Sequence, residues 1–215
     1  MQILDHIVLS ALLQNMVTGS TLGLFAGLAP GPMLTLVLSQ TLRFSAREGV
    51  KVAATPLITD PPIIAAAWLL FSQVSDIEPL LGLISCAGAM YLVFLGWEAF
   101  QVSPQDIRMT DQLPKSVFKG VLTNLLNPHP YMFWFSVGIP LLASPNHQPL
   151  SGAVFLLCFY TLLVGSKMSL ALIVDRGKSL IQSRAYLVVM RVLGSALWVF
   201  ALLFLVKGMR LFFSL

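Results

Sequence analysis

Most of this chain consists of apolar runs long enough to cross a lipid bilayer, and this limits what it can fold into. A transmembrane helix needs about 20 predominantly apolar residues, and within a bilayer only helices and closed barrels satisfy their own backbone polar groups. Hydrophobic residues make up 57% of the sequence and charged residues 10%, whereas about 25% of a soluble domain is charged. The sequence therefore predicts an all-α integral membrane protein, a single transmembrane domain over residues 1–215 with six transmembrane helices. We expect these at residues 17–42, 50–74, 78–100, 118–143, 150–174 and 187–207.

The basic residues lie mostly on one side of this predicted arrangement. Ten of the 13 Lys and Arg residues fall in or beside the connections that follow the first, third and fifth spans. The positive-inside rule places such connections in the cytoplasm, so both termini are expected to be external. Lys207 and Arg210, near the C-terminal end, are exceptions. Membrane topology thus accounts for the net charge of +4, and we expect no nucleic-acid partner.

The three spans on each side of the middle connection suggest an internal repeat. Because three is an odd number, the halves at about 17–100 and 118–207 enter the membrane in opposite directions. Inverted repeats of this kind are common in transporters. If the two halves are inverted repeats, an interruption in the first span should have a counterpart in the fourth.

The first and fourth predicted spans are both interrupted by proline. Proline removes a backbone donor and disrupts a helix interior, and a matched pair of interrupted spans points to a transporter binding site. We therefore expect two inverted three-helix repeats with Pro-broken helices 1 and 4. The alternative for each break is a kink that packs the helix bundle. The two breaks are Pro30-Gly31-Pro32 and Asn127-Pro128-His129-Pro130.

Two ionisable residues lie deep inside predicted spans, Asp60 in the second and Lys167 in the fifth. A charge at the bilayer centre costs about 2.5–3.5 kcal/mol, so such residues normally face the protein interior. We expect these two to approach one another, directly or across a solute. The alternatives are that Asp60 caps its own helix at Pro61 and Pro62, and that Lys167 snorkels to the lipid headgroups. His129 is either a proton-linked group or a polar filler beside the break.

Together these features favour a secondary transporter that works by alternating access. Half-helix N-termini favour anions and unwound carbonyls favour cations, so a site with both suits a small zwitterion such as an amino acid. The sequence contains no nucleotide-binding P-loop, no metal-ligand spacing and no Gly-x-Ser-x-Gly motif. We therefore predict no enzymatic activity, no metal and no cofactor. The predicted site residues are Pro30, Gly31, Pro32, Asp60, Asn127, Pro128, His129 and Lys167.

Four parts of the chain carry a recognisable set of motifs: "APGP" in the first span, Asp60 in the second, "GAMYLVFLG" (88–96) in the third and "FKGVLTNLLNPHPYMFW" (118–134) in the fourth. These motifs resemble those of the LysE-type (RhtB/LysE) translocators, which export amino acids. They follow one another in the family's order and spacing, and the chain is about as long as a whole member. The fifth and sixth spans match only in hydropathy.

The resemblance implies amino-acid export driven by the proton gradient, in a bacterial inner membrane, by a homo-oligomer surrounded by the lipid bilayer. The chain departs from the family's usual pattern at two positions of the predicted site. His129 stands where the family typically has Lys after Asn-Pro, and Thr59 stands where it typically has Gly before the aspartate. We expect these changes to affect the identity of the solute more than the fold.

Three other functions stay open at this level. Cys86 and Cys158 could serve a membrane thiol–disulfide electron carrier, although neither lies in a Cys-x-x-Cys motif. A metal-ion exporter of the same superfamily would have few ligands in one carboxylate and one histidine. A non-transporting membrane scaffold predicts no matched charges at depth, with Asp60 and Lys167 facing lipid or far apart.

Overall fold

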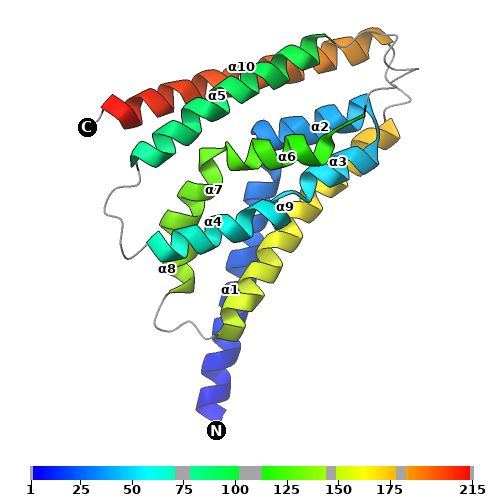
Figure 1. Ribbon diagram of the computed structural model, residues 1–215. Helices are drawn as coiled ribbons and strands as arrows, with labels where there is room; N and C mark the ends of the chain where they lie inside the picture. Colours follow the sequence, from blue (N-terminus) through cyan, green and yellow to red (C-terminus); the bar gives the residue numbers. More distant parts are fainter. Residues whose placement is uncertain (1, 71–77, 102–112, 144–148, 178–182, 214–215) are drawn as a thin grey trace.

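All the described elements of this computed structural model are helices, in agreement with the predicted fold class (Figure 1). The structure describes residues 2–70, 78–101, 113–143, 149–177 and 183–213. Within these residues, four helices are long and apolar enough to cross a membrane. A fifth span results if the bent pair of α1 (Gln2–Leu28) and α2 (Pro32–Arg43) is counted as one. The chain is therefore a multi-pass membrane protein.

The four continuous spans correspond to the second, third, fifth and sixth predicted ones. The second begins with a short helix, α3 (Ala46–Ala53), which leads after two residues into α4 (Pro56–Leu70). The others are single long helices, and α4 itself continues through its two internal prolines. Those three helices are α5 (Glu78–Phe100), α9 (Pro149–Gly177) and α10 (Ser183–Phe213).

The fourth predicted span is not one helix. It is divided into α6 (Ser116–Leu125), α7 (Pro128–Phe133), a π-helical turn η2 (Trp134–Gly138) and α8 (Ile139–Leu142). Pro128 and Pro130 in α7 and Pro140 in α8 each remove a backbone donor. The π-helical turn η2 lies between these two helices. No piece reaches the length of a membrane span. The described residues therefore contain four or five candidate spans, where the sequence predicts six.

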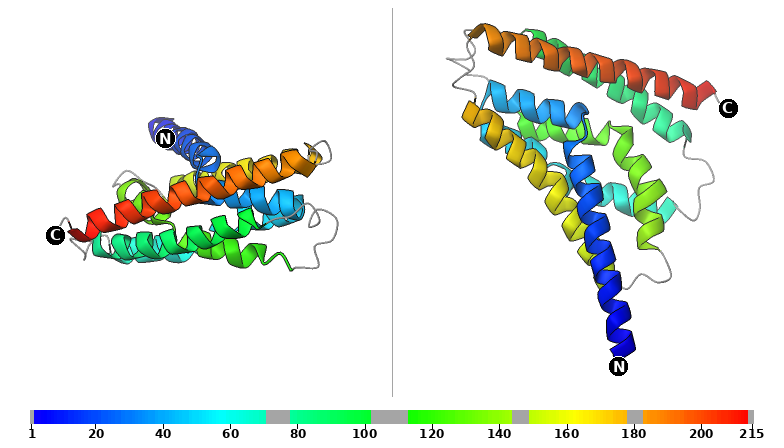
Figure 2. Two further views of the ribbon diagram at one scale, coloured as in Figure 1. Left: turned by 90° about the horizontal axis from the view of Figure 1, so that it is seen from above. Right: turned by 180° about the vertical axis from the view of Figure 1, so that it is seen from behind.

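Two long helix pairs form the sides of the molecule. Helices α5 and α10 run antiparallel along one side, and α1 and α9 run parallel along the other (Figures 1 and 2). The shorter helices lie between the pairs, and α2 contacts both α9 and α10. In α1, Gly23 allows the close approach, because a Cβ there would lie 2.3 Å from the carbonyl oxygen of Phe159. In α5, Gly88 has the same role, since its Cβ would lie 2.1 Å from the carbonyl oxygen of Leu126 at the break.

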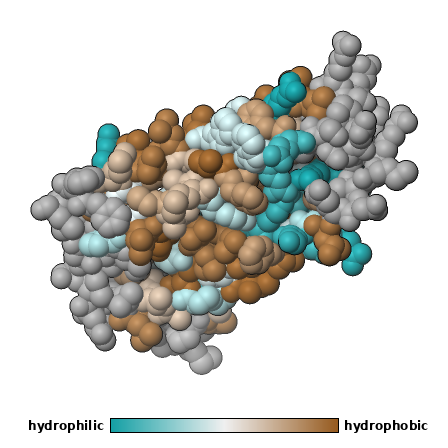
Figure 3. Space-filling model, turned by 45° about the horizontal axis from the view of Figure 1, so that its top comes forward, coloured by the Kyte–Doolittle hydropathy of each residue, from teal (hydrophilic) through white to brown (hydrophobic). Residues whose placement is uncertain are grey.

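The surface carries many large apolar side chains, as expected for helices that face lipid. Phe25, Met90 and Leu157 are each at least 70% exposed. Figure 3 shows hydrophobic residues over most of one face, with hydrophilic residues gathered toward one end.

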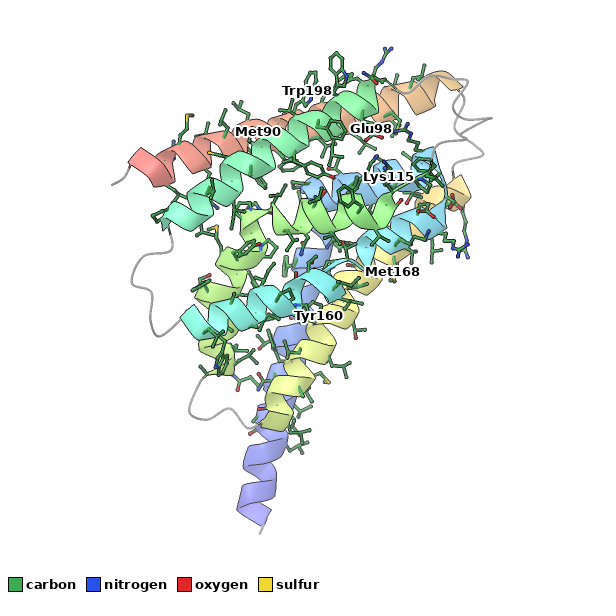
Figure 4. The ribbon with its side chains drawn as sticks, viewed as in Figure 1. Met90, Glu98, Lys115, Tyr160, Met168 and Trp198 are labelled. Atoms are coloured by element: carbon green, nitrogen blue, oxygen red, sulfur yellow. The ribbon has the colours of Figure 1, made fainter. Side chains whose placement is uncertain are left out.

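That hydrophilic end, here called the basic end, contains Arg43, Lys115 and Lys119 from the connections predicted to be cytoplasmic. The Glu98 carboxylate accepts from Arg43 at 2.7 Å and from Lys119 at 2.6 Å. Ser116 also donates to the Gln40 side chain at 3.0 Å. Figure 4 shows Glu98, near the C-terminal end of α5, and Lys115, the N-cap of α6, at the same end of the molecule. These contacts tie the ends of α2, α5 and α6 together.

Candidate solute-binding cavity

A cavity of about 270 Å³ lies at the break between α1 and α2. It lies between two buried apolar clusters, since Met33 of one and Trp134 of the other both line it. The ends of α1, the start of α2, and parts of α4, α6, α7, η2, α9 and α10 contribute to its wall. The break therefore lies inside protein, where non-helical backbone at membrane depth is tolerated.

The end of α1 explains how a buried lysine is satisfied. Within a helix, the carbonyl of Ala26 would accept from the N–H of residue 30, but Pro30 has no N–H. The ammonium of Lys167, in α9, donates to this carbonyl at 3.0 Å. Lys167 is only 4% exposed, so it does not snorkel to the headgroups, and this alternative is excluded.

The start of α2 forms part of the cavity wall. Gly31 is the N-cap, and Thr35 is the first residue whose N–H bonds back to it, at 3.0 Å. The N–H groups of Met33 and Leu34 belong to the first turn, which has no partners within a helix, and both residues line the cavity. These donors and the helix dipole favour an anionic group at this point.

The second break has a different polar character. The Asn127 side chain caps α7 by accepting from the His129 N–H at 3.0 Å, and it lies 2.8 Å from the His129 ring nitrogen Nδ1. Pro128 and Pro130 carry no N–H, and the Tyr131 hydroxyl donates to the carbonyl of Leu125 at 2.9 Å. At the second break, side chains of the break itself therefore bind the His129 N–H and the Leu125 carbonyl, whereas at the first break the Ala26 carbonyl is bound by Lys167 of a distant helix.

Asp60 binds side chains from other helices. Its carboxylate accepts from the Asn124 amide of α6 at 2.7 Å and from the Tyr160 hydroxyl of α9 at 3.0 Å. The Asn124 amide also donates to the Thr59 hydroxyl at 2.6 Å, and the Trp134 indole lies beside the carboxylate. Asp60 is 4% exposed, and α4 continues past it. Its carboxylate therefore links α4 to α6 and α9 and does not cap its own helix.

Asp60 and Lys167 face the same cavity without forming a direct ion pair. Both line it, and their charges interact, but the ion pairs within 4.0 Å among the described residues do not include this one. The Asp60 carboxylate can accept more hydrogen bonds than the two that it receives from Asn124 and Tyr160. The Lys167 ammonium has three N–H groups, one of which donates to the Ala26 carbonyl. Both can therefore bind a further polar group placed between them.

The structure brings most of the predicted site residues together, while their roles stay a prediction. Pro128 is fully buried and lies outside the lining. Pro30 and His129 are exposed and form the rim of the cavity, whereas Asp60 and Lys167 are buried and form its floor. The predicted residues that line the cavity are Pro30, Gly31, Pro32, Asp60, Asn127, His129 and Lys167.

Sequence reasoning missed two polar partners and the aromatic walls. Asn124 precedes Asn127 by one helical turn, and Tyr160 precedes Lys167 by two turns on the same face of α9, so spacing could have indicated both. Figure 4 shows Tyr160 where α9 passes α4. The aromatic residues of the wall are Phe133, Trp134, Phe159 and Phe200.

Residues 24–208, from the last turns of α1 to near the end of α10, match the family model for the LysE type translocator. The chain belongs to this family. It is therefore a membrane translocator and not an enzyme. No curated protein and no solved structure matches the chain with significance.

Membership in the LysE type translocator family confirms the resemblance read from the motifs. The match includes both proline breaks and both buried charges of the cavity. Cys86 and Cys158 are free thiols on α5 and α9 of this translocator. Family and geometry thus favour transport of a small solute over the thiol–disulfide alternative.

Proposed function

We propose that this LysE-type translocator exports amino acids, or related small zwitterionic metabolites, across a bacterial inner membrane. One observation carries the proposal: a buried carboxylate and a buried ammonium line one cavity without pairing with each other. A zwitterion supplies the opposite charge for both groups at once. Its ammonium binds Asp60, and its carboxylate binds Lys167 and the first-turn amides of α2.

The cavity also favours a solute with a modest apolar part. Aromatic and aliphatic side chains make up much of the wall, including Phe159, Leu163 and Phe200. Binding sites of this kind combine an apolar wall with a few placed polar groups that fix orientation. The described residues contain no group of three His, Cys, Asp or Glu side chains that could hold a metal ion, so a metal cargo has less support.

Alternating access follows from treating the halves as inverted repeats, with α6 to α8 as the fourth of six spans. Under this exchange α1 corresponds to α6, α2 to α7, α4 to α9, and α5 to α10. The contacts of α1 and α2 with α9 then have their counterparts in the contacts of α6 and α7 with α4. The antiparallel pair of α5 and α10 is its own counterpart. This pattern supports one transporter domain made of two inverted three-helix units.

The ionic contacts at the basic end supply a gate for this cycle. Glu98 joins Arg43 of the first half to Lys119 of the second half, on the cytoplasmic side in the proposed topology. With these contacts made, the cytoplasmic side is closed, and loading a solute from the cytoplasm requires them to open. Both termini then lie outside the cytoplasm.

We assign proton coupling to the titratable groups of the cavity, and in particular to Asp60. When protonated, Asp60 loses its attraction for the solute's ammonium, so proton entry from outside favours release there. We also propose that the translocator works as a homo-oligomer in the bilayer.

The test uses cells that overproduce the protein and are loaded with dipeptides, from which amino acids accumulate internally. We expect overproduction to raise amino-acid efflux and the Asp60→Asn variant, present at equal level in the membrane, to abolish the increase. Unchanged export of every amino acid on overproduction would contradict the proposed function.

A further inference from the structure

A second cation faces the broken fourth span beyond the cavity. The ammonium of Lys207, on α10, contacts the sulfur of Met132 on α7. One turn earlier on each helix, the rings of His129 and Phe204 pack with their centroids 5.7 Å apart. Because residues three apart share a helix face, these are successive contacts between α7 and α10. Lys207 thus lies one helical turn beyond His129 in the direction in which α10 leaves the basic end.

The partner of Lys207 is unusual for an ammonium. A thioether is a weak acceptor, and Lys207 lies inside the apolar span Leu187–Leu211. In the described part of the chain the ion pairs within 4.0 Å use Glu48 and Glu98, and none uses Lys207. The residue lies about 9 Å from the end of α10 at the helical rise, within reach of headgroups, yet its ammonium is turned to α7.

Lys207 is connected to the cavity through His129. The His129 side chain is exposed at the cavity rim, and Lys207 is close enough for its charge to act on the imidazole. From the floor outward, the cationic or proton-accepting groups are therefore Lys167, His129 and Lys207. In this order, a carboxylate that leaves Lys167 toward the C-terminal end of α10 passes His129 at the rim before it reaches Lys207.

We propose that Lys207 is a second carboxylate-binding group, which receives the solute's carboxylate after it leaves Lys167. This inference rests on the proposed export of zwitterions. The bound carboxylate replaces the weak thioether contact with a charge-assisted hydrogen bond and draws the solute out of the cavity. An anionic lipid headgroup offers the same chemistry, so the test separates the two sources.

The experiment measures efflux from proteoliposomes of phosphatidylcholine alone, preloaded with an exported amino acid and its carboxamide, which lacks the carboxylate. We expect Lys207→Gln to slow efflux of the amino acid about tenfold, the effect of losing one charge-assisted hydrogen bond, and to leave the carboxamide unchanged. Lys207→Arg should restore the rate. Arg210→Gln, one turn further along the same helix, is the matched control and should have no effect.

Equal slowing of the amino acid and the carboxamide would overturn the inference, as would a defect that appears only when anionic lipid is added. Lys207→Met provides a second variant, because removing a charge from an apolar span favours membrane insertion. If the unaltered protein exports the amino acid and both variants match it, Lys207 has no such role. If the unaltered protein exports neither solute, the proposed function fails, and this inference fails with it.

Discussion

The Lys167 ammonium donates to the Ala26 carbonyl at 3.0 Å, and Ala26 is four residues before Pro30. The proline in one half of the chain thus frees the acceptor that the buried lysine of the other half uses. The break and the charge act together, which neither a packing kink nor a snorkelling lysine explains.

The first prediction concerns this pairing. Pro30→Ala supplies an N–H that competes with Lys167 for the Ala26 carbonyl and extends α1 into the break. We expect slower efflux from proteoliposomes, by about tenfold. In a double-mutant cycle with Lys167→Met, the two effects should be non-additive by about 0.5–3 kcal/mol. Pro62→Ala is the control, since α4 continues through Pro62 and the efflux rate should not change; additive effects would contradict the pairing.

The second prediction concerns the side chains that hold Asp60. Tyr160→Phe removes the hydroxyl that donates to the carboxylate at 3.0 Å, while it keeps the aromatic ring between α4 and α9. Loss of a hydrogen bond to a charged group costs about 1.5–3 kcal/mol, so solute affinity should fall at least about tenfold. Equilibrium binding to the purified protein measures this effect. Tyr91→Phe is the matched control, because its hydroxyl donates to the Lys119 carbonyl at 3.5 Å and Tyr91 does not line the cavity.

The third prediction concerns the gate at the basic end. Glu98→Gln weakens the contacts with Arg43 and Lys119, so the cytoplasmic side should open more often. In a variant without native cysteines, Ser39→Cys, buried on α2, should then react severalfold faster with a permeable maleimide. Lys51→Gln is the control, because its pair with Glu48 lies within one helix and should leave the reaction rate unchanged. A reaction rate that Glu98→Gln does not alter would argue against the gate.

The fourth prediction concerns the close approach of α1 to α9. Gly23→Ala places a methyl group 2.3 Å from the Phe159 carbonyl oxygen, so the helices must separate. Overpacking of this kind costs about 1–3 kcal/mol, which should lower the thermal midpoint of the purified protein by several degrees. Gly165→Ala in α9 meets no atom within 4 Å and should leave the midpoint unchanged. Equal midpoints for both variants would contradict the described helix packing.

The sequence could predict the helical membrane class, most of the spans and the family, because hydropathy and motif spacing are local properties. It predicted the break at Pro128 and Pro130 in the fourth span, but it could not predict the π-helical turn η2 or the separate helix α8 that follow, because these depend on the surrounding packing. For residues 134–142, a continuous helix would fit the same sequence equally well.

The charged residues illustrate the same limit within the site. Depth along the spans indicated that Asp60 and Lys167 face inward, and both line the cavity. Their actual partners, the Asn124 amide and the Ala26 carbonyl, come from distant parts of the chain, so hydropathy carries no sign of them. The spacing of Gly19, Gly23 and Gly27 is a further unused local signal, because small residues four apart mark close helix contacts.

The most direct test of the central claim is equilibrium binding to the purified protein of an amino acid, its carboxamide and its deaminated analogue. We predict that the unaltered protein prefers the zwitterion to both analogues by about tenfold or more, the value of one charge-assisted contact. Lys167→Met should abolish the preference over the carboxamide, and Asp60→Asn should abolish the preference over the deaminated analogue. If both variants keep the full preference for the zwitterion, the two buried charges do not bind the solute and the account is wrong.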